Sequence, residues 1–284
     1  NALILHNYAV TSLHCGRLSQ AARLFEQAYA RDGSRDLLYQ AGAAWFEAEN
    51  YDQAVQVMQR LLQGTQEPKN AWIQLLVYSL VRAQKWKQAE TRLQTMIHQA
   101  PNSSELWRLL AYVRSQQDKV LGAAAALELA YAMDDPGPEK WRNLASMYAA
   151  AGVPLMAIKA LRNGLGKNPD PEHCWRMGRL YAEALRIDKA VDWMDRALAL
   201  RDKPEWHLDK AHVLYTNGRY PQCRTSAVRA AERGPQVRGE AWMLAGYAAW
   251  QEQDWRGAKK AFARAREVQE TASQAASCLQ TMEQ

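Results

Sequence analysis

The chain has 284 residues, of which 48% are hydrophobic and 23% are charged, a balance typical of a folded globular protein and not of a disordered one. Its formal net charge is +6 and it contains no block of five like charges, so it lacks the concentrated basic stripe typical of nucleic-acid binding. No apolar run approaches the roughly 18 residues that a membrane span requires. We therefore expect neither a nucleic-acid partner nor insertion into a membrane.

The chain begins directly on a helical pattern after Asn1 and Ala2, and no signal peptide precedes this pattern. These two residues resemble a cloning remnant. We therefore expect that a targeting segment has been removed.

Along the chain, a small residue recurs with a period close to 34 residues. The intervals between successive occurrences are 33, 35, 34, 34, 33, 33 and 35 residues. A fixed period of this length is the signature of a solenoid built from short structural repeats. The recurring residues are Ala21, Ala54, Ala89, Ala123, Ala157, Ala190, Cys223 and Ala258.

Each period predicts one helical hairpin, and the hairpins begin near residues 2, 35, 70, 104, 138, 171, 204 and 239. A first helix carries a large residue near its start, as at Trp141, and a small residue about one turn later, as at Ala145. A tight turn follows, because glycine and proline close together, as in Gly152-Val153-Pro154, end a helix. The second helix begins with the recurring small residue. After the last hairpin, residues 269–284 have the helical spacing of alanine and leucine that predicts a capping helix.

This pattern resembles the tetratricopeptide repeat (TPR) family, whose repeat reads Trp-x-x-Leu-Gly-x-x-Tyr, then Ala, Phe, Ala and Pro. The resemblance covers Leu3 to about Val268. It implies an all-α fold, a right-handed α-solenoid of about eight helix-turn-helix repeats over residues 1–268, with the capping helix after it. The matching residues are Trp141, Leu144, Ala145, Tyr148, Gly152, Ala157, Leu161 and Pro169, and again Trp242, Gly246, Ala258, Phe262 and Ala265.

The seventh repeat departs from this pattern. Cys223 stands where the other repeats have alanine, and His207 stands where a bulky residue is expected, with Trp206 one place away. We expect this repeat to pack irregularly.

No arrangement of residues predicts catalysis, a cofactor or a metal ion. The six histidines form no HExxH motif, and the chain has no phosphate-binding loop and no nucleophile elbow. The four cysteines lie far apart without zinc-ligand spacing, and buried cysteine acts as a small hydrophobe. We therefore expect a protein that is not an enzyme.

The TPR resemblance implies a groove, lined by the first helices, that holds a peptide or a partner helix. Four arginines from successive repeats predict a basic ladder in this groove, and so a protein or peptide partner of acidic character. The aromatic residues are equally consistent with packing between repeats. The residues predicted to face the groove are Tyr39, Phe46, Gln74, Tyr78, Arg82, Arg108, Tyr112, Arg142, Ser146, Trp175, Arg179, His212, Tyr215, Tyr247 and Trp250. The ladder consists of Arg82, Arg108, Arg142 and Arg179.

Several longer stretches resemble a narrower group, the bacterial TPR proteins encoded beside TonB, ExbB and ExbD components. This resemblance implies a periplasmic scaffold of an energised outer-membrane uptake system. A cytoplasmic TPR co-chaperone or assembly adaptor that recognises an acidic peptide is the alternative, and no oligomeric state is predicted. The stretches that carry the resemblance are residues 105–134, 143–165, 188–200 and 238–265.

Overall fold

The structure, a computed structural model, describes residues 1–65, 68–165 and 169–283, and every regular element in these residues is a helix. Its contacts divide the chain into two compact units, unit 1 (Asn1–Asp135) and unit 2 (Pro136–Gln284). Unit 1 holds α1 (Ala2–His14), α2 (Leu18–Asp32), α3 (Arg35–Glu47), α4 (Tyr51–Leu62), α5 (Asn70–Arg82), α6 (Trp86–Gln99), α7 (Ser104–Ser115) and α8 (Val120–Met133). Unit 2 holds α9 (Pro138–Ala150), α10 (Pro154–Asn163), α11 (Pro171–Glu183), α12 (Ile187–Leu200), α13 (Pro204–Thr216), α14 (Tyr220–Arg233), the 3₁₀ helix η1 (Pro235–Val237), α15 (Arg238–Gln251), α16 (Trp255–Arg266) and α17 (Ala272–Thr281).

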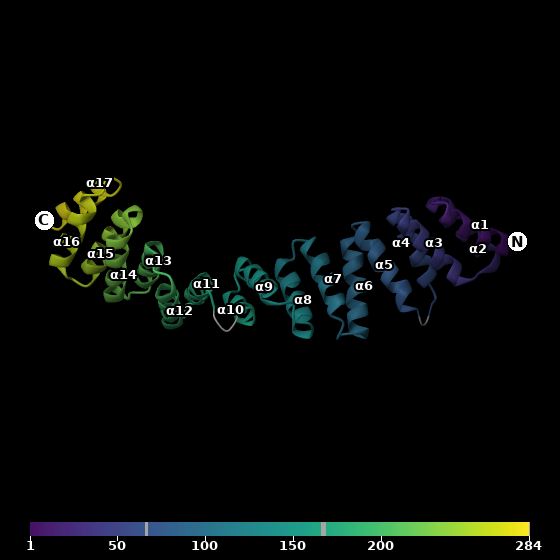
Figure 1. Ribbon diagram of the computed structural model, residues 1–284, viewed down its shortest axis with the longest axis horizontal. Helices are drawn as coiled ribbons and strands as arrows, with labels where there is room; N and C mark the ends of the chain where they lie inside the picture. Colours follow the sequence, from purple (N-terminus) through teal and green to yellow (C-terminus); the bar gives the residue numbers. More distant parts are fainter. Residues whose placement is uncertain (66–67, 166–168, 284) are drawn as a thin grey trace. The chain divides into compact units, whose positions relative to one another are not determined.

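Within each unit, a helix packs mainly against the helices that precede and follow it, so that the units are stacks of helical hairpins (Figure 1). The first repeat is α1 with α2, and each following pair of α-helices forms the next repeat up to α15 with α16. The expected all-α class of stacked hairpins is confirmed. The continuity of one superhelix through residues 135 and 136 stays a prediction.

Every hairpin turns at one residue whose backbone is left-handed, with φ between 55° and 72°. The N–H of the following residue donates to a first-helix carbonyl, as from Val153 to Tyr148 at 2.9 Å and from Arg186 to Tyr181 at 2.8 Å. This arrangement satisfies the last carbonyls of the first helix and reverses the chain. The left-handed residues are Gly16, Glu49, Gln84, Asp118, Gly152, Leu185, Gly218 and Gln253.

The recurring small residue lies five positions after the left-handed residue, and in all eight repeats its exposed fraction is 0 or 1%. Cys223 fills this place in the seventh repeat, where burial raises the pKa of its thiol to about 12. Glycines in the first helices allow similarly close packing. A Cβ atom on Gly178 would lie 2.6 Å from Met194 Cγ, and one on Gly246 would lie 2.5 Å from the Phe262 ring. These helix pairs meet closely because the glycine at the contact has no side chain.

The large residues of the first helices fill the core between neighbouring hairpins. In unit 2 the rings of Trp175 and Trp206 stack, with centroids 4.9 Å apart and planes inclined by 6°. Trp175 is only 7% exposed. Its predicted place in a groove was therefore wrong, because the ring packs against the next repeat. In the seventh repeat Trp206 and the adjacent His207 are both buried, and His207 Nε2 lies 2.7 Å from Asp202.

The C-terminal helix α17 covers the last hairpin. It packs on α16 with Ala275 fully buried, and the Gln274 amide donates to the Tyr247 hydroxyl at 3.0 Å. It lies inside the segment from which a capping helix was expected, whose last residue, Gln284, lies outside the described residues.

The turn geometry predicts that Leu185→Gly stabilises the protein. Leu185 is 77% exposed, so glycine loses little packing there, whereas the left-handed backbone costs an L-residue roughly 1–2 kcal/mol. We expect the free energy of unfolding, measured by urea denaturation with circular dichroism, to rise by about 0.5–1 kcal/mol. Leu185→Ala is the matched control, because it removes the same exposed side chain but keeps the Cβ atom. Equal stability of the two variants would contradict the prediction.

Candidate functional site

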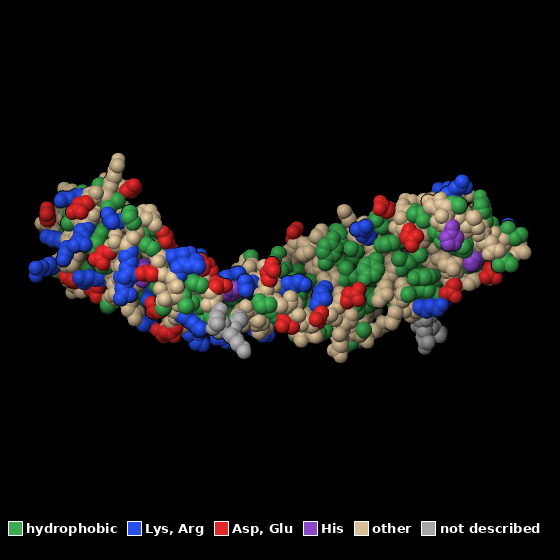
Figure 2. Space-filling model, in the orientation of Figure 1, with side chains coloured by type: hydrophobic (Ala, Val, Ile, Leu, Met, Phe, Trp, Pro, Cys, Tyr) green, Lys and Arg blue, Asp and Glu red, His purple; other side chains and the backbone are tan. Residues whose placement is uncertain are grey.

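Unit 1 contains a cavity of about 350 Å³ between α5, α6 and α7, which we call the unit 1 cavity. Figure 2 shows hydrophobic side chains gathered over these helices on the face that it presents. A concave site that combines apolar walls with polar groups is typical of binding sites. The apolar lining is Ile73, Val77, Met96, Ala100, Leu106 and Leu109, and the polar lining is Asn70, Gln74, Tyr78, Gln99, Ser103 and Glu105.

Helical spacing brings the α5 lining together. Gln74 and Tyr78 are four residues apart, and so are Ile73 and Val77, so one polar and one apolar row of α5 face the cavity side by side. Gln74 and Tyr78 are two of the residues that the sequence predicted for partner binding. Of the predicted residues, these two line the unit 1 cavity.

A hydrogen bond joins α5 and α7, the first helices of two successive repeats, across the cavity. The Tyr78 hydroxyl donates to Glu105 Oε1 at 2.9 Å. This hydrogen bond is the largest cause of a raised Tyr78 pKa, followed by burial and by the Glu105 charge. The hydroxyl therefore stays protonated and keeps donating at neutral pH. Because the described lining contains this carboxylate and no lysine or arginine, it favours apolar and hydrogen-bonding groups over acidic ones.

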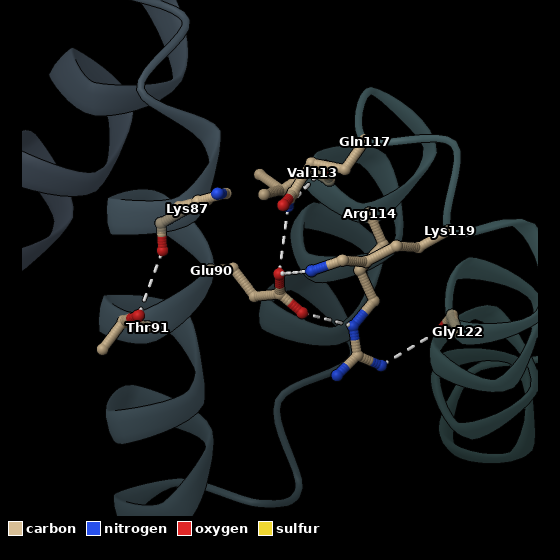
Figure 3. A network of polar contacts seen from close by, with 8 residues as sticks. All are labelled: Lys87, Glu90, Thr91, Val113, Arg114, Gln117, Lys119 and Gly122. Atoms are coloured by element: carbon tan, nitrogen blue, oxygen red, sulfur yellow. Dashed lines mark hydrogen bonds and ion pairs between the residues drawn. The ribbon is translucent and has the colours of Figure 1, made fainter.

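At the other end of α6, Glu90 fixes this helix to the next repeat (Figure 3). Its carboxylate accepts hydrogen bonds from Arg114 Nε at 2.9 Å, Lys119 Nζ at 2.6 Å and Gln117 Nε2 at 3.0 Å. Arg114 also donates to the Gly122 carbonyl at 3.1 Å. The hydrogen bond from Lys119, above all, lowers the Glu90 pKa to about 2 against the opposing effect of burial. This network holds α6 and α7 together and so positions two walls of the cavity.

The other predicted residues of unit 1 have partners within that unit. The Arg82 guanidinium lies 5.4 Å from the centroid of the Tyr51 ring, and Arg108 pairs with Asp134. Tyr112 is 48% exposed and stands edge-on to Trp86, with centroids 6.1 Å apart. Tyr39 and Phe46 are half-buried against the core of unit 1.

In unit 2 two predicted basic residues lie on the first helices. Arg142 is half-buried, and its Nε atom has no hydrogen-bond partner among the described residues. Arg179 is exposed and lies near Asp209. Burial is the main cause of a raised Asp209 pKa, and the positive charge of Arg179 acts in the opposite direction. Because Arg82 and Arg108 belong to unit 1, the four-residue ladder stays a prediction.

The remaining predicted residues of unit 2 are engaged locally. The Ser146 hydroxyl accepts from Arg176 at 2.6 Å, and His212 Nε2 lies 2.9 Å from Glu240. The half-buried aromatic residues form edge-to-face pairs, namely Tyr215 with Tyr220, Tyr247 with Phe262, and Trp250 with Trp255 and Phe262.

Sequence reasoning missed the Glu90 network and the role of Glu105. Glu105 lies 27 residues after Tyr78, seven short of the average period, which corresponds to about two helical turns. Comparing successive first helices in register would have placed the two side chains next to each other. Glu90 directly follows Ala89, a recurring small residue, but nothing in the period predicts its partners.

Within the part of the chain that the structure describes, no group of three histidine, cysteine, aspartate or glutamate residues could hold a metal ion. None of the described helices combines the length and the apolar character needed to span a membrane.

Comparison with known proteins identifies the repeat. One family model described as tetratricopeptide repeat matches residues 46–112, and a second with the same description matches residues 16–71 and 208–276. Together they span more than half of the chain. No curated protein matches it.

Solved structures with similar helices include a fragment of MamA from Desulfovibrio magneticus RS-1. It is 19% identical, with a TM-score of 0.46, over 57% of this chain and 92% of its own. Another is the C-terminal part of a TPR repeat-containing protein from Cytophaga hutchinsonii. It is 15% identical, with a TM-score of 0.48, over 84% of this chain and 98% of its own.

The lowered pKa of Glu90 predicts an acid-sensitive contribution to stability. A carboxylate whose folded pKa is about 2 instead of 4.5 stabilises the fold above pH 4.5 and loses this effect as the pH falls through 2. We expect Glu90→Gln to lower the free energy of unfolding by about 2–3 kcal/mol at pH 7 and by much less near pH 2. Denaturant unfolding at both pH values measures this. Glu47→Gln, which changes an exposed carboxylate on α3, is the control, and a difference that did not depend on pH would refute the assignment.

Proposed function

Because the chain is built from tetratricopeptide repeats, we propose that it is a non-catalytic scaffold that binds a segment of a partner protein, and that the unit 1 cavity receives an apolar side chain of this segment. The observation that carries the proposal is the cavity itself. It opens between two successive first helices, α5 and α7, and combines apolar walls with a rim of amides.

The chemistry of the lining supports this kind of ligand. Burying one leucine-sized side chain against Ile73, Val77 and Leu106 would contribute about 1.5–3 kcal/mol. The amides of Gln74 and Gln99 can each donate to a carbonyl and accept from an N–H of an extended backbone. At this site a neutral or basic segment fits better than the acidic one that the predicted arginine ladder implied.

We place the scaffold in the periplasm, as an accessory of a TonB-type transport system. The resemblance of residues 105–134 and 238–265 to proteins encoded beside TonB, ExbB and ExbD supports this proposal. The partner would then be a periplasmic segment of a TonB-type protein, and the natural protein would be exported.

A cytoplasmic adaptor for acidic peptides is the second candidate. The charge of unit 2 favours it, because residues 136–284 contain 23 lysines and arginines against 17 aspartates and glutamates. Cell fractionation of the natural protein distinguishes the two compartments.

Selection of peptides from a displayed random library on the immobilised full chain tests the binding site. We expect the enriched peptides to share one apolar position, because the cavity admits one such side chain. Gln74→Trp, which places a bulky ring at the exposed rim, should weaken their binding by about tenfold or more.

Gln56→Trp, at an exposed position on α4, is the matched control and should leave binding unchanged. Equal binding to both variants would show that the cavity is not the site. The scaffold function itself would be refuted if neither library peptides nor a purified periplasmic TonB segment bound the chain.

A further inference from the structure

Unit 2 contains a second pocket, of about 440 Å³, between α10, α11 and α12, which we call the Tyr181 pocket. Its lining includes the apolar side chains of Leu155 and Ile158 and the cations of Lys159, Arg162, Arg186 and Lys189, and among the described residues it contains no carboxylate. It shares none of the residues predicted for the groove.

Two of these cations converge on one fixed phenol. Arg162 Nη2 donates to the Tyr181 hydroxyl at 2.6 Å, and Lys189 Nζ lies 5.8 Å from the centroid of the Tyr181 ring. Tyr181 is only 4% exposed, so the group on which they converge is held by the fold. In the described part of the chain, Arg162, Arg186 and Lys189 form no ion pair with a carboxylate.

Comparison of the repeats shows that a cation takes this place in the fifth repeat alone. Arg162 lies five residues after a recurring small residue, and the equivalent residues of the other repeats are Glu26, Gln59, Gln94, Glu128, Asp195, Val228 and Ala263. Glu26 binds Arg60 at 2.9 Å, and Asp195 binds Lys210 at 2.5 Å. In the fifth repeat an arginine takes this place, so the position adds a positive charge to the pocket where Glu26 and Asp195 add a negative one.

The charge of the whole unit adds to this local excess. Residues 1–135 contain 13 basic and 13 acidic residues, so the formal net charge of +6 lies entirely in residues 136–284. Lysine and arginine side chains are abundant over α11 to α16 in Figure 2. A positive field of this kind attracts an acidic partner, and a pocket with several cations gives that attraction a place to act.

We propose that the Tyr181 pocket binds a carboxylate side chain of an acidic partner segment. The carboxylate accepts hydrogen bonds from Arg162 and Arg186, and a neighbouring apolar side chain of the segment lies on Leu155 and Ile158. Arginine suits this role because its planar guanidinium can bind both carboxylate oxygens at once. This proposal rests on the scaffold function but names a different unit and a different ligand chemistry from those of the unit 1 cavity.

Fluorescence anisotropy with the full chain and a labelled Glu-Glu-Leu-Glu-Glu-Leu peptide tests the proposal. The triple variant Arg162→Gln, Arg186→Gln, Lys189→Gln should weaken binding by about tenfold or more, because it removes the cations that meet the carboxylate. The matched control is Arg256→Gln, Lys259→Gln, Lys260→Gln, which removes the same charge from exposed positions on α16 of the same unit. An equal loss in both triple variants would indicate general attraction and would overturn the proposal.

If circular dichroism shows that the triple variant is misfolded, the double variant Arg186→Gln, Lys189→Gln replaces it in the binding assay. The double variant keeps the hydrogen bond from Arg162 to Tyr181 and removes the other two cations. A Gln-Gln-Leu-Gln-Gln-Leu peptide, which carries no charge, should bind the triple variant and the unaltered chain equally, because it offers the cations of the Tyr181 pocket no carboxylate. If inorganic phosphate displaced the glutamate peptide at a lower concentration than free glutamate did, the pocket would be a phosphate site and the carboxylate assignment would be wrong.

The unit 1 cavity gives an independent control. In the Gln74→Trp background the triple variant should weaken binding of the glutamate peptide by the same factor as in the unaltered chain, so a failure of the cavity proposal and a failure of this one are measured separately. If the triple variant had no effect in that background, the peptide would be bound through the unit 1 cavity and the assignment to the Tyr181 pocket would be wrong.

Discussion

The whole arrangement depends on one backbone constraint, the left-handed residue that reverses the chain in each hairpin. It places a nearly inaccessible small residue five positions later, where the second helix meets its neighbours. Because this position holds only alanine or cysteine, the backbones of the packed helices approach closely and the register of both helices is fixed. Three of the eight turns use glycine, and the other five place an L-residue in a conformation that it rarely adopts. Packing of the hairpin on its neighbours offsets this local cost.

A fixed register means that one place in the fold recurs with different chemistry. The residue nine positions before the small residue is Trp45, Arg114 or Tyr181 in three of the repeats, and each contacts the second helix of the preceding repeat. Trp45 donates to Glu26 at 2.8 Å and Arg114 donates to Glu90 at 2.9 Å, whereas Tyr181 accepts from Arg162. In the first two contacts the residue donates a hydrogen bond to a carboxylate of the preceding repeat, and Arg114 also supplies the opposite charge. In the third contact, the Arg162 guanidinium lies beside the Tyr181 pocket. The position that stabilises the stack of hairpins in other repeats is therefore available for binding in this one.

The period predicted the hairpins, their turns and the buried small residues, because these follow from spacing alone. It did not predict which surface residues are free. Trp175 carries a side chain that suits a groove, yet stacking on Trp206 buries it, because its ring reaches the next first helix. Arg108 was placed on the correct helix, but its guanidinium pairs with Asp134 at the end of α8. A cavity between three helices depends on how far they separate, and spacing along the chain contains no such information.

The distribution of charge then separates what the two units can bind. The prediction of an acidic partner rested on four arginines that come from both units, but unit 1 is formally neutral, and among the described residues the only charged side chain that lines its cavity is Glu105. An acidic group there would meet a carboxylate already engaged by Tyr78, whereas an apolar side chain would meet only complementary walls. In unit 2 the excess of basic residues and the pocket without a carboxylate favour the opposite ligand. The same repeat therefore supports two kinds of recognition, because the backbone fixes the register and the side chains at a few recurring places decide the chemistry.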